Sequence, residues 1–354
     1  MTLPATDATL DSQGILDAAA RLPEQMMDAV ERARGLDNLP DREEIEHVVV
    51  LGMGGSAIAG EVLQGAAGPY VPVPVLVFRG YNVPAFVDES SLVFAISFSG
   101  NTEETVEAVS EAALQGARIV AVTRGGELAR RAEAWDAPVV SIADDIPQPR
   151  AGIGALTVPL MIVLEEIGLF PGASHWIDLA VDQLTTRRDR LARPGGQGEE
   201  LARRIGRTIP VVYGAGDLGG AAAHRWKTQM NENPKIPAFW NTQPELCHNE
   251  ICGWGQHGDL TRQAMTVVNL RHDFEHPQVM ERFRLVNELI EEVVADVLEV
   301  QAEGEGELAQ LLDLVMVGDF TSIHMALQEG IDPGPVPVLD EIKTALKGAQ
   351  TDES

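Results

Sequence analysis

Apolar and polar positions alternate along the first half of the chain in a pattern typical of an α/β fold. Apolar runs at 48–51, 73–78, 92–96, 119–123 and 139–142 have the length of buried strands, and amphipathic segments of helix length separate them. A second alternation follows, with strands expected at 209–213, 265–270 and 297–300. Strands that alternate with helices favour parallel pairing. We therefore predict an α/β chain of two diverged, doubly wound units, each a parallel sheet flanked by helices.

Breaks in this pattern divide the chain into four segments. Its 354 residues exceed what a single hydrophobic core usually organises. Residues 1–40 are expected to form an N-terminal helical extension, and residues 41–170 the first unit. Residues 171–205 are charged, helical in pattern and interrupted at Pro194, which is typical of a linker. Residues 206–354 then form the second unit and a C-terminal helix.

Two polar turns containing glycine each lie between a predicted strand and a predicted helix of the first unit. One reads Gly52-Met53-Gly54-Gly55-Ser56, and the other reads Ser97-Phe98-Ser99-Gly100-Asn101-Thr102. Hydroxyl donors, a glycine backbone and the positive end of a helix dipole suit a phosphate group. The alternative is that the polar residues of the second turn only cap its helix. The phosphate interpretation predicts contacts from Gly54, Gly55, Ser56, Ser97, Ser99 and Thr102.

Two common nucleotide motifs do not fit these turns. The spacing G-x-G-x-x-G fails because residue 57 is alanine, and no acidic ribose partner follows about twenty residues later. A Walker motif is excluded because no lysine precedes Lys227. The ligand expected here is therefore a phosphorylated small molecule rather than a dinucleotide or ATP.

The amino-acid composition argues against several classes of binding partner. A formal net charge of −28 argues against nucleic acid, which requires a basic face. No run of eighteen apolar residues and no signal-peptide pattern occur, so we expect a cytoplasmic protein without a membrane partner. The two cysteines, Cys247 and Cys252, fit reduced thiols, and with His248 they fall short of a zinc ligand set. We predict neither a metal nor a cofactor.

The two turns together resemble the sugar isomerase (SIS) fold. The segment 225–233, RWKTQMNEN, and the later His248-Asn249-Glu250 narrow the resemblance to the bifunctional phosphoglucose/phosphomannose isomerases. The likeness runs from about residue 48 to residue 346. It implies two SIS units and a cofactor-independent aldose–ketose isomerase that interconverts glucose 6-phosphate and fructose 6-phosphate through a cis-enediol. Mannose 6-phosphate as a further substrate stays open.

The resemblance also implies roles for four chemical groups. Glu250 matches the general base, and Arg150 matches the arginine beside the developing enediolate. His276 is assigned to ring opening, with His272 as a competitor, and Lys343 matches a lysine of the C-terminal helix that assists in the same step. In the family the histidine is reached from the partner subunit, which implies a homodimer with composite active sites. Helix caps or surface ion pairs remain the alternative for each residue.

One position departs from the family pattern. The loop before the C-terminal helix reads Asp332-Pro333-Gly334-Pro335, where the family has Asp-Pro-Thr-Pro. Glycine removes the hydroxyl and the methyl group of a threonine associated with turnover of mannose 6-phosphate, and this leaves the preference between epimers open. The alternative function is a non-catalytic sugar-phosphate sensor, which would need the phosphate turns but not the whole catalytic set.

Overall fold

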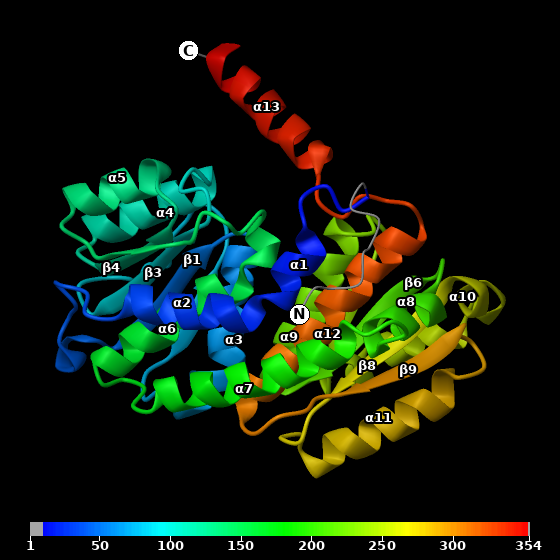
Figure 1. The fold of residues 1–354 in the computed structure, drawn as a ribbon. Coiled ribbons are helices and arrows are strands. Elements are labelled where there is room, and N and C mark those ends of the chain that lie inside the picture. Colours follow the sequence, from blue (N-terminus) through cyan, green and yellow to red (C-terminus); the bar gives the residue numbers. More distant parts are fainter. Residues whose placement is uncertain (1–9, 353–354) are drawn as a thin grey trace.

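The computed structural model describes residues 10–352 and confirms the predicted α/β fold, with two parallel sheets flanked by helices (Figure 1). In the first unit the sheet order is β2-β1-β3-β4-β5, and every pairing is parallel. The strands are β1 (His47–Gly52), β2 (Val75–Phe78), β3 (Ser91–Ser97), β4 (Arg118–Thr123) and β5 (Val139–Ser141). The helices are α3 (Gly55–Ala67), α4 (Glu103–Leu114), α5 (Gly126–Ala134) and α6 (Ile153–Glu166).

Helices cover both faces of this first sheet, which explains why its strands are apolar throughout. Val48 and Val50 of β1 point into a core shared with α3 and α6. The alternate residues Val49 and Leu51 point into a second core, shared with α4 and α5. The helices that follow β1 and β3 therefore lie on opposite faces of the sheet.

The second unit has a four-stranded parallel sheet with the order β7-β6-β8-β9. Its strands are β6 (Ile209–Ala215), β7 (Phe239–Gln243), β8 (Met265–Arg271) and β9 (Asp296–Gln301). Its helices are α9 (Gly216–Glu232), α10 (Gly258–Ala264), α11 (Pro277–Ile290) and α12 (Glu307–Gln328). The hydrophobic pattern did not predict β7, because this edge strand exposes Phe239 and Trp240 and continues with polar residues.

The segments outside the two sheets pack onto them. The N-terminal helices α1 (Ile15–Ala20) and α2 (Leu22–Ala33) join the first core, where Leu22 and Met26 pack against Gly154 of α6. Between the units lie α7 (Ala173–Leu191) and α8 (Gln197–Ile205). A buried ion pair of 3.1 Å between Arg187 Nε and an Asp313 carboxylate oxygen ties α7 to α12. The segment expected as a linker is thus part of the packed body.

The units meet where α3 and α9 pack in opposite directions. Near the end of α3, a Cβ on Gly65 would lie 3.0 Å from the carbonyl oxygen of Asp217, at the start of α9. The start of α3 lies instead beside residues 149–150, which contact the end of α9. The first turn of the phosphate prediction is therefore close to the C-terminus of α9.

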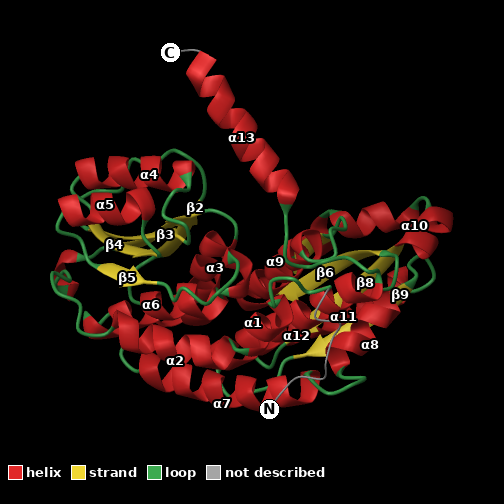
Figure 2. Ribbon diagram, turned by 45° about the horizontal axis from the view of Figure 1, so that its top comes forward, coloured by secondary structure: helices red, strands yellow, loops and turns green. Residues whose placement is uncertain are grey.

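The last helix, α13 (Pro337–Asp352), leaves this body, as Figures 1 and 2 both show. Val338, Ile342 and Leu346 follow one another at intervals of four residues, which places them on one face of the helix. All three side chains are more than half exposed. No described helix is both long enough and apolar enough to cross a membrane.

Candidate functional site

The two predicted phosphate turns lie at the carboxyl edge of the first sheet, at the end of the adjacent strands β1 and β3. The chain passes from β1 to β2 on one side and from β3 to β4 on the other, so strand order reverses between them. In open α/β sheets, ligands bind at such a switch point. The N-termini of α3 and α4 both begin there, which adds two helix dipoles that favour an anion.

The turn after β3 directs its hydroxyl groups to one another rather than to the helix. Thr102 is the N-cap residue of α4, yet its side chain makes no capping hydrogen bond. Ser97 Oγ instead donates to Thr102 Oγ1 at 2.9 Å, and Ser99 Oγ accepts from the backbone N–H of Asn101 at 3.2 Å. The Thr102 side chain therefore does not cap α4, contrary to the alternative interpretation.

The turn after β1 consists largely of glycine, so its exposed polar groups are mainly those of the backbone. Gly54 has φ +53°, a conformation that favours glycine, and provides the N-cap of α3 without a side chain. Ser56 is buried in the first turn of that helix. A Cβ on Gly55 would lie 3.5 Å from the carbonyl oxygen of Pro149, so the segment 149–151 closes one side of this turn.

Arg150 is buried beside this turn and holds several segments together. Its Nε donates to Asn233 Oδ1 at 2.9 Å, and Nη2 donates to the carbonyl oxygens of Pro333 and Gly334 at 2.5 and 2.6 Å. Burial lowers the pKa of its guanidinium. Arg150 thus fixes the loop before α13 against the end of α9.

Glu232, the last residue of α9, completes the contacts of this guanidinium. Its Oε2 accepts from Arg150 Nη1 at 3.4 Å, and its side chain is 30% exposed. The motif 225–233 did not by itself identify Glu232 as a catalytic candidate. One signal was available, because a carboxylate at a helix C-terminus opposes the helix dipole and therefore needs another reason to be there.

A cavity of about 300 Å³ lies beside this carboxylate. Glu232 and Lys343 both line it, together with Pro149, which touches the phosphate turn. Lys343 is largely exposed and lies 4.0 Å from Asp340 on its own helix. Lys343 and Glu232 thus line one cavity, whose neighbours are Arg150, through Glu232, and the turn after β1, through Pro149. The remaining lining residues are Gln13, Gln148, Pro335, Val336, Pro337, Leu339 and Asp340.

Glu250 lies elsewhere in the chain. It accepts hydrogen bonds from the hydroxyl of Tyr213 and, at 2.6 Å, from Asn241 Nδ2. The Tyr213 side chain belongs to the core under α11, whereas Val212 and Val268 face α9 and the first unit. Within one chain, the second sheet therefore separates Glu250 from the phosphate turns. Sequence reasoning missed Tyr213 and Asn241 because neither strand end carries a recognisable motif.

The two histidines considered for ring opening have different surroundings. His276 is exposed and caps α11, where its Nδ1 accepts from the backbone N–H of Gln278 at 3.1 Å. His272 is buried, with Nε2 3.1 Å from the carbonyl oxygen of Ala215, and burial lowers its pKa. Neither lines the cavity beside Glu232. An exposed histidine can meet a partner subunit, whereas a buried one cannot.

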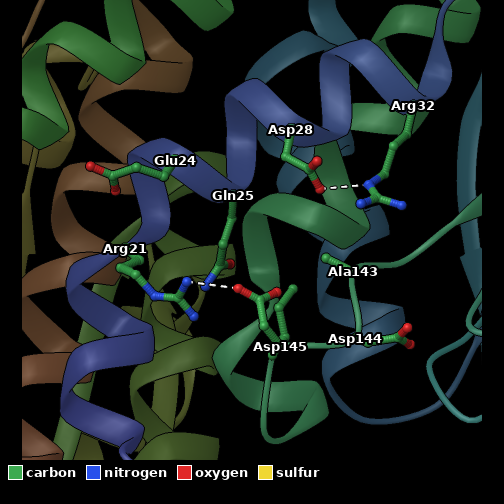
Figure 3. A pocket seen from close by; sticks show the side chains of 9 residues that line it. Arg21, Glu24, Gln25, Asp28, Arg32, Ala143, Asp144 and Asp145 are labelled. Atoms are coloured by element: carbon green, nitrogen blue, oxygen red, sulfur yellow. Dashed lines mark hydrogen bonds and ion pairs between the residues drawn. The ribbon is translucent and has the colours of Figure 1, made fainter.

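A larger hollow, between α2 and residues 143–146, has a different character (Figure 3). Its arginines are already paired: Arg21 contacts Asp145 at 2.7 Å and Arg32 contacts Asp28 at 2.6 Å. The first pair joins the start of α2 to the loop after β5, and the second lies within α2. Both arginines that line the hollow are therefore already paired. We therefore assign it no part in the site.

Comparison with known proteins agrees with the two-unit architecture. An SIS domain model matches residues 43–161, and the model of the bacterial phospho-glucose isomerase C-terminal SIS domain matches residues 196–346. The chain is 34% identical over 337 residues to the bifunctional phosphoglucose/phosphomannose isomerase of Caldicellulosiruptor bescii, covering 94% of this chain and 98% of that protein. The chain belongs to the family of bifunctional phosphoglucose/phosphomannose isomerases.

Further comparisons place this isomerase within the same group. It is 32% identical over 312 residues to the bifunctional phosphoglucose/phosphomannose isomerase of Aquifex aeolicus, covering 88% of this chain and 93% of that protein. Among solved structures, the C-terminal domain of glucosamine-fructose-6-phosphate aminotransferase from Francisella tularensis aligns with a TM-score of 0.67 at 16% identity. The alignment covers 94% of this chain and 100% of that one. At 16% identity, the likeness to the Francisella tularensis structure shows a shared fold alone.

Proposed function

We propose that this isomerase interconverts fructose 6-phosphate with glucose 6-phosphate, and with mannose 6-phosphate, without a cofactor. The observation that carries the proposal is the cavity that Glu232 and Lys343 both line, next to Arg150, which contacts Glu232, and to Pro149, which lies beside the start of α3. Family membership supports the substrate class. The geometry supports a site that holds a phosphate at one end and offers a carboxylate at the other.

The phosphate group is proposed to bind in the two turns. Backbone amides at Gly54 and Gly55 and the hydroxyls of Ser56, Ser97, Ser99 and Thr102 would donate to its oxygens. Thr102 Oγ1 already accepts from Ser97, so its own O–H group is available to donate outward. Uncharged donors at helix N-termini hold a group that must not react, and the charged side chains remain for the carbon skeleton.

Glu232 is proposed as the general base. A carboxylate within reach of two neighbouring carbons can take the proton from C2 of the aldose and return it to C1, giving the ketose through a cis-enediol. Arg150 holds Glu232 and the loop 332–334 in place, and four of its five N–H groups have partners. A fixed guanidinium beside the carboxylate would stabilise the negative charge of the enediolate.

Ring opening precedes proton transfer and is proposed to use Lys343 and a histidine. Lys343 lines the cavity and can transfer a proton at a ring oxygen. His276 is exposed on the far side of the second sheet, so it would have to come from a partner subunit. This requirement supports a homodimer with composite active sites.

The decisive experiment compares two isosteric variants, Glu232→Gln and Glu250→Gln. Fructose 6-phosphate is supplied without added metal, and glucose 6-phosphate and mannose 6-phosphate are followed separately. In Glu232→Gln we expect kcat to fall by about 10²-fold or more, with substrate binding retained, because the base is lost and the shape kept. Exchange of a C1 proton of fructose 6-phosphate with solvent should disappear as well, because the same base removes it to form the enediol.

The outcome for Glu250→Gln separates the two candidate bases. A large loss in that variant with full activity in Glu232→Gln would return the role to Glu250, supplied across a subunit boundary. A wild-type protein that binds fructose 6-phosphate and turns over none would favour the sugar-phosphate sensor instead.

A further inference from the structure

Residues from the N-terminal extension close one side of the cavity. The carboxylate of Asp11 accepts from the backbone N–H groups of Ile15 and Leu16 at 2.8 and 2.9 Å, which fixes the start of α1. The N–H of Ser12 donates to Asp332 Oδ1 at 3.4 Å. These contacts hold Gln13 between α1 and the loop that precedes α13.

The side chain of Gln13 occupies the space that a side chain at position 334 would need. A Cβ on Gly334 would lie 2.9 Å from both Cβ and Cγ of Gln13 and 3.0 Å from its Cδ. A change of rotamer can move Cγ and Cδ away, but Cβ is fixed by the backbone, so the contact with Cβ cannot be relieved without moving the backbone of Gln13. Glycine at 334 is therefore what allows Gln13 to reach the cavity.

Of the two polar groups of the Gln13 side-chain amide, only the oxygen has a hydrogen-bond partner among the described residues. Its Oε1 accepts from Gln148 Nε2 at 2.8 Å. Its own N–H groups have no hydrogen-bond partner within residues 10–352, and the side chain lines the same cavity as Glu232 and Lys343. A primary amide has two N–H donors, which bind hydroxyl and carbonyl oxygens.

We propose that Gln13 is a specificity-determining residue that donates a hydrogen bond to an oxygen at the reacting end of the open-chain sugar. Glu232 must reach C1 and C2, and Gln13 lines the same cavity, so the oxygen belongs to this end rather than to the phosphate. Glucose 6-phosphate and mannose 6-phosphate differ in configuration at C2 alone. A fixed donor beside C2 therefore favours one epimer. The inference rests on the proposed isomerase function.

The test compares Gln13→Ala with wild type and with a control variant, Gln115→Ala, whose side chain is exposed at the end of α4. In Gln13→Ala we expect KM for fructose 6-phosphate to rise about 3- to 10-fold through loss of one hydrogen bond. The ratio of the two aldose products should change at least about 2-fold, by the same loss. An unchanged KM and an unchanged product ratio in Gln13→Ala would overturn the inference.

A second set of variants tests the packing. Gly334→Thr should lower the melting temperature, and Gln13→Gly combined with Gly334→Thr should restore it, because glycine at position 13 also removes the Cβ that the new side chain would meet. Full stability of Gly334→Thr alone would contradict this arrangement.

A binding measurement separates this inference from the proposed function. If the wild-type protein turned over no sugar phosphate, isothermal titration with fructose 6-phosphate would still have to show weaker binding by Gln13→Ala. Equal affinity of the two proteins would refute the role of Gln13. No binding by either protein would refute both proposals.

Discussion

At the scale of single residues, the turn after β3 contains a hydrogen bond between two hydroxyl groups that bears on the proposed phosphate site. Ser97 donates to Thr102, and this orients the hydroxyl of Thr102 so that its hydrogen can point outward. A hydrogen bond to a charged group contributes about 1.5 to 3 kcal/mol. We expect Thr102→Val, which keeps the shape, to raise KM for fructose 6-phosphate by about 10-fold or more and to leave kcat nearly unchanged, because phosphate binding is equal in ground and transition states.

Steady-state kinetics check this prediction, with Thr186→Val as the control, since Thr186 bonds only within its own helix, to Asp182. The double variant Ser99→Ala/Thr102→Val should have a still higher KM for fructose 6-phosphate. An unchanged KM in that double variant would remove the turn after β3 from the site.

At the scale of elements, the turn after β3 depends on close packing against the start of α5. Gly100 has φ +72°, and a Cβ there would overlap the carbonyl oxygen of Gly125. Asn101 Oδ1 accepts from the N–H of Glu127 at 3.1 Å, which joins the same two elements. We expect Gly100→Ala to destabilise the protein by about 3 kcal/mol, from the left-handed backbone and the overlap together.

Urea unfolding measures this loss, and Gly35→Ala is the matched control. Gly35 has φ +64° with open space around it, so alanine there should cost only about 1 kcal/mol. Equal losses in the two variants would show that the contact with Gly125 contributes nothing to stability.

At the scale of the whole molecule, the proposed homodimer makes a prediction about mixed subunits. If His276 serves the partner's site, then Glu232→Gln and His276→Ala protomers should complement each other, because one site of each mixed dimer carries neither defect. Random reassociation makes half of the dimers mixed, so recovery should approach about a quarter of wild-type activity. Activity after mild dissociation and mixing is the measurement, and sedimentation velocity verifies the dimers. Verified mixed dimers without activity would assign ring opening to another histidine.

Much of this protein follows from local patterns in its sequence. The alternating apolar runs, the two glycine turns and the family motifs depend on residues close together in the chain, so they predict the two α/β units, the switch-point phosphate turns and the kind of chemistry. The strand β7 was missed because an exposed edge strand has little hydrophobic signal.

Only the tertiary structure decided which of the chain's acidic residues lies near the turn after β1, where we propose that the phosphate binds. Glu232 and Glu250 both stand in motif segments, and the position of Glu232 at the end of a helix is a local signal too weak to choose between them. The antiparallel packing of α3 against α9 brings Glu232 to Arg150, and the second sheet places Glu250 on its other face. In the same way Gln13 reaches Gly334 across more than three hundred positions. Such contacts depend on how whole helices and loops pack against one another. The spacing of residues along the chain carries no information about that packing.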